Sequence, residues 1–241
     1  MDIAAANRTI STARLLKTTV VFSLPGAGPT QTVVIGQEDS GIDVEAIQTA
    51  VDTGGSVLLL GTFDFGDDGR VLLHKDIAIS GEADTSGRPT TTIIGGDSPF
   101  FAPPPADRHT APRGPLISIE GIHFNQPAGG AIHLVYTGGA FIRGNKVTAI
   151  RTRPLSAFLH EAGVLIGPRD AFVISRICQP LVTGSIVVVE NEVHLAGHDP
   201  TISSNVAAWV HPINGADIYV ARNITTRCAP SCVDCGRSRA A

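Results

Sequence analysis

Aromatic and charged residues are both scarce in this chain of 241 residues. Phe, Tyr and Trp make up 5% of it and charged residues 17%, with a formal net charge of −4. This small negative charge gives no reason to expect nucleic-acid binding, and no apolar run approaches the roughly 20 residues of a membrane span. Hydrophobic residues still make up 43% of the chain, so one soluble domain with a sizeable core is expected.

Short motifs of known catalytic sites are also missing. The serines lack a G-x-S-x-G elbow, and Cys178 lies in the apolar stretch "SRICQPLV", which indicates a core position. Cys228, Cys232 and Cys235 are spaced C-x3-C-x2-C without a well-spaced fourth ligand. A tail at 227–241 that is unstructured or carries a disulfide is therefore favoured over a zinc site.

The N-terminal 40 residues contain no clear signal peptide. Their short apolar stretch follows Arg14 and Lys17, whereas the charged region of a signal lies nearer the start. A strand "TVVFSL" that ends at Pro25-Gly26 is the expectation, within an extension at 1–40 that precedes the main domain.

Glycine and proline are plentiful, at 26 and 16 residues, and they predict many turns. A single helix is expected in "GIDVEAIQTAVDTGG" (41–55), where Val44, Ile47 and Val51 have helical spacing. Asp43 is expected to cap its first turn, and Gly54-Gly55 to end it. The remaining residues predict short strands and turns.

Similar segments recur along these predicted strands. "IEGIHF", "IRGNKV", "VVENEV" and "VARNIT" begin at 119, 142, 188 and 220, at separations of 23, 46 and 32 residues. Since 46 is twice 23, a unit of about 23 residues is predicted, with a degenerate copy beginning near Leu165. A period of this size is typical of a solenoid.

The repeated segment itself predicts a bend. Ile142 and Val147 are five positions apart and cannot both point inward on one straight strand. A bend at Gly144-Asn145 resolves this conflict, because glycine and asparagine tolerate positive φ. Two short strands then meet at an angle, and Asn145, Asn191 and Asn223 are expected to stack as a ladder of side-chain amides.

The stretch "DVEAIQTAVDTGGSVLLLGTFDFGDDGRVLLHKDIAISGE…TTIIGG" resembles the start of right-handed parallel β-helix proteins of the pectate-lyase-like superfamily. The resemblance covers residues 41–226 and implies an all-β, right-handed parallel β-helix (solenoid) with a short N-terminal capping helix. Inside that domain, residues 97–115 carry six prolines and are expected to form a loop without regular structure. The resemblance also makes an extracellular or periplasmic location plausible.

If the repeats stack, the position after each bend forms a column of His123, Lys146, Arg169 and Glu192. Together with Arg143, the cations Lys146 and Arg169 then form a basic patch suited to an acidic polysaccharide or oligosaccharide. The hypothesis is a lyase in which Lys146 is the base and Arg143 and Arg169 neutralise the substrate carboxylate, with His123, Glu190, Glu192 and His194 in substrate binding.

Two alternatives stay open. One is a glycoside hydrolase or esterase that uses "ENEVHLAGHD", with Glu190, Glu192, His194, His198 and Asp199; the other is a non-catalytic solenoid that binds a glycan or a protein. No cofactor is expected. Calcium, which pectate lyases often use, is the exception to consider, but the repeats lack the cluster of aspartates that would bind it. The aspartates of "DFGDDG" (64–69) are typical of a turn.

Overall fold

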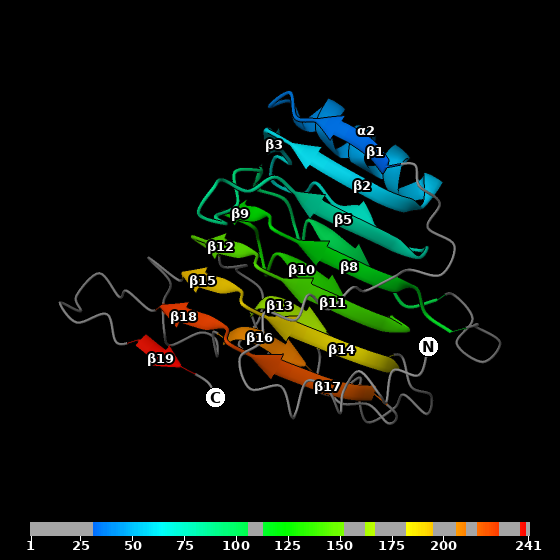
Figure 1. Cartoon of the computed structure of the whole chain (residues 1–241). Coiled ribbons are helices and arrows are strands. Elements are labelled where there is room, and N and C mark those ends of the chain that lie inside the picture. Colours follow the sequence, from blue (N-terminus) through cyan, green and yellow to red (C-terminus); the bar gives the residue numbers. More distant parts are fainter. Residues whose placement is uncertain are drawn as a thin grey trace.

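The computed structural model describes residues 31–105, 113–151, 162–166, 182–194, 206–210, 216–226 and 237–239. These residues form one helix, as the sequence predicts, and three sheets of short strands. All strand pairs are parallel except β18 and β19, which pair antiparallel at the end of one sheet. The chain is therefore mostly β, with the strands lying side by side in long parallel sheets (Figure 1).

Each sheet is an ordered row of strands taken from distant parts of the sequence. Sheet A consists, in spatial order, of β1 (Gln31–Ile35), β2 (Gly55–Leu60), β5 (Ile77–Gly81), β8 (Leu116–Glu120), β11 (Gly139–Arg143), β14 (Gly184–Val189) and β17 (Ala216–Ala221). Sheet B consists of β3 (Thr62–Asp64), β6 (Thr92–Ile94), β9 (His123–Asn125), β12 (Lys146–Thr148), β15 (Glu192–His194), β18 (Ile224–Thr226) and β19 (Arg237–Arg239). Sheet C consists of β4 (Val71–Leu72), β7 (Phe100–Ala102), β10 (Ile132–Leu134), β13 (Ala162–Ile166) and β16 (Val206–Val210).

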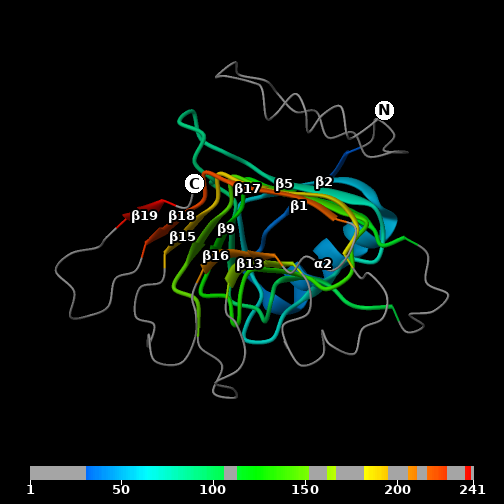
Figure 2. The ribbon, with the colours of Figure 1, turned by 90° about the horizontal axis from the view of Figure 1, so that it is seen from below.

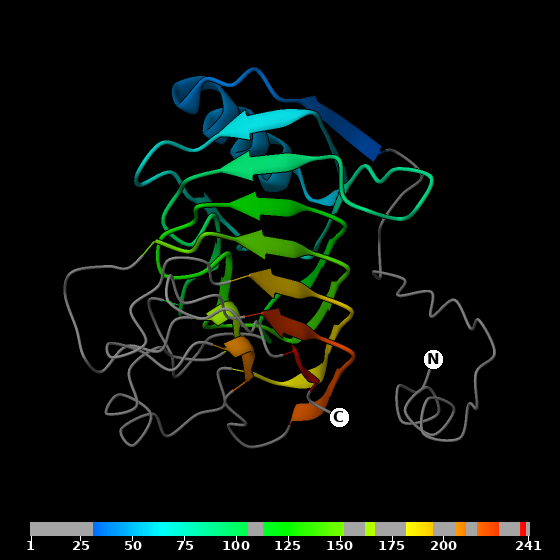
Figure 3. The same cartoon turned by 90° about the vertical axis from the view of Figure 1, so that its left-hand side faces the viewer.

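The chain visits the three sheets in a fixed rotation. From β2 to β16 it passes through A, B and C in turn, and β17 and β18 then return to A and B. Each new strand is added beside the previous strand of its sheet, so the three sheets lengthen together (Figure 3). Seen from below in Figure 2, the strands of one sheet lie over one another. We call each A, B, C set of strands a layer.

Inward side chains of successive layers stack into apolar columns. In sheet A one column contains Val57, Ile79, Ile119, Ile142 and Val188, and in sheet B one contains Phe63, Ile93, Phe124, Val147 and Val193. All ten are at most 1% exposed. Phe100 of sheet C packs edge-on against Phe124, with ring centroids 5.7 Å apart. Strands about 4.8 Å apart bring these side chains into contact, and burial of each stabilises the fold by roughly 1.5–3 kcal/mol.

The helix α2 (Ser40–Thr53) packs on the first layer through Ile47, Ala50 and Val51. It ends before Gly54, as predicted, and the φ of Gly54 is 81°. The predicted cap is wrong: the side chain of Asp39 accepts hydrogen bonds from the first-turn amides. Asp43 instead is buried and accepts from the backbone N–H groups of Gln37, Asp39 and Asp64. Within the described residues no helix is long and apolar enough to cross a membrane.

The interpretation of the 46-residue spacing as two repeats is wrong. β13, which contains Leu165, pairs with β10 and β16 in sheet C and completes the layer that begins with β11. Lys146 of β12 therefore pairs directly with Glu192 of β15, with no strand between them. The 46 residues form one long layer, because extra residues are inserted around β13.

Two further predictions also need correction. The repeat "VARNIT" predicts that Val220 points inward and is buried, but Val220 is 37% exposed, because β17 is the last described strand of sheet A and no described strand lies beyond it. The segment 97–115 was expected to lack regular structure, but Phe100–Ala102 forms β7 of sheet C. Phe100 and Ala102 are fully buried there, since the prolines of the segment lie outside these three residues. At the other end, β1 of the N-terminal extension pairs with β2 and so extends sheet A.

Candidate functional site

The outer face of sheet B gathers six polar side chains from three neighbouring strands. In β9, β12 and β15 the first residues pair in the order His123, Lys146, Glu192 and the third residues in the order Asn125, Thr148, His194. The residue between them in each strand points inward and is fully buried. We call these six residues the B-face patch. Three of the four members of the predicted column are thus neighbours.

The bends between sheets A and B set the position of this patch. Gly121, Gly144, Glu190 and Arg222 each precede a sheet B strand by two residues and have left-handed φ values of 65°, 61°, 60° and 56°. The prediction of a positive φ at Gly144 is confirmed. Because each bend has the same geometry, the sheet B strands that follow start in register with one another, and the first side chain of each points outward.

The residue after each of the last three bends is a buried asparagine. Nδ2 of Asn145 donates to Oδ1 of Asn191 at 3.1 Å, and Nδ2 of Asn191 donates to Oδ1 of Asn223 at 2.9 Å. Each amide also donates to a backbone carbonyl of the preceding layer. The predicted asparagine ladder is confirmed, and it fixes the layers at the corner from which the B-face patch begins.

A hydrogen-bond chain crosses the patch. Nε2 of His123 lies 2.9 Å from Oγ1 of Thr148, and this hydroxyl donates to Oδ1 of Asn125 at 3.1 Å. All three side chains are only partly buried, so the chain is close to solvent. The sequence-based search for charged columns missed Asn125 and Thr148. The same alternation of outward and inward residues that placed His123 and Lys146 could have found them.

The charges in the patch are mixed. Burial lowers the pKa of His123 below its ordinary value of 6.5, and the nearby charges of Lys146 and His194 lower it further. Nε2 of His194 lies 3.5 Å from Oε2 of Glu192. The patch thus offers a neutral imidazole beside a lysine cation at one end and a carboxylate with a second histidine at the other.

The predicted basic patch is only partly assembled. Arg143 is the last residue of β11 in sheet A, and its Nε contacts Oε2 of Glu190 at 2.9 Å. Oε1 of the same carboxylate contacts Arg222 at 2.7 Å. Arg143 and Glu190 are therefore used in a surface ion-pair cluster at the bends. The direct pairing of Lys146 with Glu192 excludes Arg169 from the column, and Arg169 itself lies outside the described residues.

Several residues of the remaining hypotheses lie outside the described part of the chain, namely His198, Asp199, Cys178, Cys228, Cys232 and Cys235. Glu190, the first carboxylate proposed for hydrolysis, is already paired with the guanidinium groups of Arg143 and Arg222. In "DFGDDG", Asp64 accepts from the backbone of Gly66, and Asp67 pairs with Arg151, as expected of a turn.

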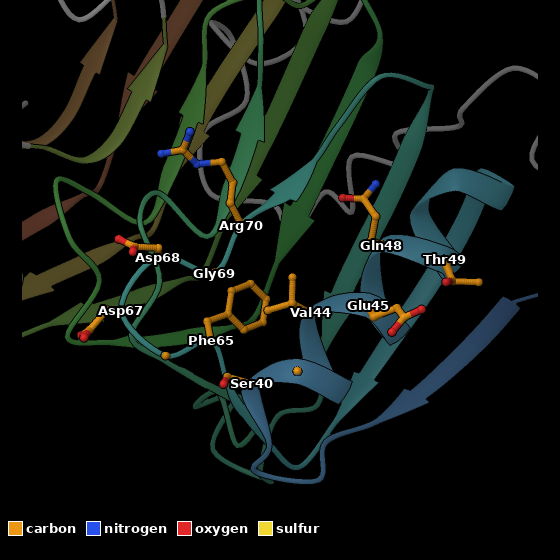
Figure 4. A pocket seen from close by; sticks show the side chains of 12 residues that line it. Ser40, Val44, Glu45, Gln48, Thr49, Phe65, Asp67, Asp68, Gly69 and Arg70 are labelled. Carbon is orange, nitrogen blue, oxygen red and sulfur yellow. The ribbon is translucent and has the colours of Figure 1, made fainter.

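A cleft of about 550 Å³ lies between α2 and the segment 65–70, away from the B-face patch. Val44 of the helix and Phe65 of the loop lie side by side in it, with Glu45, Asp67 and Asp68 around them (Figure 4). Gln48 in its wall is held by the backbone of Leu72 through both its amide N and O atoms. Arg70 in its wall pairs with Asp97 at 2.6 Å. Among the described residues there is no group of three His, Cys, Asp or Glu side chains that could hold a metal ion.

Comparisons with known proteins add no relative: neither a family model, nor a curated protein, nor a solved structure matches this chain.

Proposed function

We propose that this chain is a right-handed parallel β-helix, similar to the pectate-lyase-like superfamily, and that it binds an acidic polysaccharide along the outer face of sheet B. The A, B, C rotation of parallel strands supports the β-helix. Right-handed crossovers between parallel strands are by far the commoner kind, which supports the handedness. The asparagine ladder at one corner supports regular layers.

The observation that carries the binding function is the B-face patch itself. Two adjacent rows of polar side chains run across the strands, and their spacing of about 4.8 Å is set by the backbone rather than by flexible loops. Lys146 is the cation for a sugar carboxylate, while Asn125, Thr148 and the two histidines are donors and acceptors for hydroxyl groups. Unlike Arg143, Lys146 has no salt bridge with any acidic residue of the described chain.

Binding of polygalacturonate and alginate oligosaccharides, measured by calorimetry, tests this function. Lys146→Gln removes the cation and should weaken binding roughly 10- to 100-fold, the equivalent of a lost charge-assisted hydrogen bond of about 1.5–3 kcal/mol. Lys75→Gln is the matched control: Lys75 donates to the backbone carbonyl of Asp52 in α2, outside the B-face patch, so its loss should leave the affinity unchanged. Equal losses in both variants would mean attraction by overall charge, and no binding by the unmodified protein would refute the proposal.

Eliminative cleavage at the same face is the second candidate function, and the neutral form of His123 favours it. A lyase on a uronate needs a base for the proton beside the carboxylate and a cation for the charge that develops. A neutral His123 next to Lys146 provides both, with Lys146 as the cation instead of the base. Unsaturated uronate products, detected by their ultraviolet absorbance, test this candidate. Their absence with every acidic polysaccharide would leave a binding protein.

A further inference from the structure

The hydrogen-bond chain on sheet B determines which nitrogen of His123 carries the proton. The hydroxyl of Thr148 has one hydrogen, and it is donated to Oδ1 of Asn125. Toward His123 the same oxygen can then only accept, so Nε2, which lies 2.9 Å away, must be the donor. A neutral imidazole has one N–H, which leaves the free electron pair on Nδ1.

We propose that Asn125 and Thr148 are positioning residues that hold neutral His123 with its proton on Nε2, and that Nδ1 of His123 is the proton acceptor of the site. In the first part, the position of the proton rests on the contacts, and the neutral form rests on the burial of the ring and the nearby charges. The second rests on the proposed function, and specifically on eliminative cleavage of an acidic polysaccharide.

The surroundings of His123 suit a base with a fixed tautomer. Phe124, the next residue, is fully buried in the core, and the strands on both sides hold the backbone of β9 in register. The charged or titratable neighbours on the face are Lys146 in β12 and Glu192 and His194 in β15; Thr92 in β6 is the uncharged neighbour on the other side. Burial lowers the pKa of His123 most and the charges of Lys146 and His194 lower it further, so His123 stays unprotonated near neutral pH.

The chemical step balances without a metal or a redox partner. Nδ1 of His123 takes the proton at C5 of a uronate, and the electron pair of that C–H bond forms the C4=C5 double bond. The bond from C4 to the glycosidic oxygen breaks, and the leaving oxygen takes a proton from water. The imidazolium then releases its proton to the resulting hydroxide, which restores both His123 and the water.

Long-range ¹H–¹⁵N spectra of the full ¹⁵N-labelled chain at about pH 8 identify the tautomer directly. The expected result is a protonated Nε2 and an unprotonated Nδ1 for His123. Thr148→Val, which keeps the shape and removes the acceptor, should give a mixture of tautomers, whereas Thr148→Ser should keep the Nε2–H form. Lys146→Gln should raise the pKa of His123 in the same spectra, because a neighbouring cation is removed.

The same variants are then tested on polygalacturonate and alginate. His123→Gln should abolish unsaturated products, Thr148→Val should lower the rate roughly tenfold or more, and Thr148→Ser should stay near the original rate. An Nδ1–H tautomer in the unmodified chain overturns the positioning role. The Nε2–H tautomer without elimination on any acidic polysaccharide overturns the base role and the eliminative function, while the hydrogen-bond chain stands as a structural feature.

Discussion

Two polar columns run across the layers and share two of them, one column inside the corner between sheets A and B and one outside on sheet B. The inner column, Asn145, Asn191 and Asn223, is buried, and its amides bond to each other and to backbone carbonyls. The outer column is His123, Lys146 and Glu192, and its side chains are partly buried or exposed. In the two shared layers, Lys146 and Glu192 directly follow Asn145 and Asn191. A step of one residue thus separates polar groups that hold the fold together from polar groups available to a ligand.

The largest expected effect comes from breaking the inner column. Asn191→Ala leaves the backbone N–H and the side-chain amide of Asn145 without their acceptor, in a site from which water is excluded. At about 1–3 kcal/mol for each unsatisfied group, the free energy of unfolding should fall by roughly 3–5 kcal/mol, as measured by denaturant titration. Asn125→Ala on the outer face is the control and should cost about 1 kcal/mol or less. An equal loss of unfolding free energy in the two variants would contradict the claim that the inner column stabilises the fold and the outer face does not.

A second prediction compares two valines with the same inward register. Val188 is 0% exposed and pairs with Val220, which is 37% exposed in the last described strand of sheet A. Val188→Thr should destabilise the fold by about 1–3 kcal/mol because it buries a hydroxyl group, and Val220→Thr should cost clearly less. Chemical denaturation of both variants measures the difference. A cost at Val220 as large as that at Val188 would show that this end of sheet A is covered in solution.

The ion-pair cluster at the bends should matter less. Glu190→Gln removes the charge that Arg143 and Arg222 share, but these side chains are 37% to 66% exposed. Exposed ion pairs contribute about 0–1 kcal/mol, so the melting temperature should change little and the change should shrink further in high salt. A large and salt-independent loss would mean that the cluster, and not the asparagine ladder, holds the corner.

The smallest expected effect is the pH dependence that His123 imposes on stability. Its pKa is lowered in the folded state, so the unfolded chain binds more protons between the folded pKa and the ordinary value of 6.5. The contribution is therefore fully present above 6.5 and is lost as the pH falls through the folded pKa. His123→Gln should flatten this part of the profile of unfolding free energy against pH. An unchanged profile would mean that another group titrates there.

The sequence predicts the inner column correctly and the outer column only in part. The inner column follows from "RGNKV" and its repeats, because a bend with glycine and asparagine leaves few other places for the amide. Arg169 was placed wrongly because equal spacing was assumed, and residues inserted around β13 doubled one layer without adding a strand to sheets A or B. The role of Arg143 in an ion pair was missed because Glu190 occupies the bend position that glycine holds one layer earlier.

At the N-terminal end, too, the sequence predicts local features but not contacts between distant residues. The helix and its end at Gly54 depend on residues that are close together in the sequence, so the sequence predicts both correctly. The use of Asp43 to join the helix to β3 depends on contact with Asp64, which is 21 residues away, and local capping rules do not describe such a contact. The cleft beside α2 was likewise unforeseen, since it forms only where the helix meets the segment 65–70.

The most direct test of the central claim is a map of the binding surface from amide chemical-shift changes during titration of the full chain with galacturonate oligosaccharides. The account predicts the largest changes at the six residues of the B-face patch, with small changes at the buried Asn145 and Asn191. Changes confined to the cleft beside α2, or no changes at saturating oligosaccharide, would contradict it.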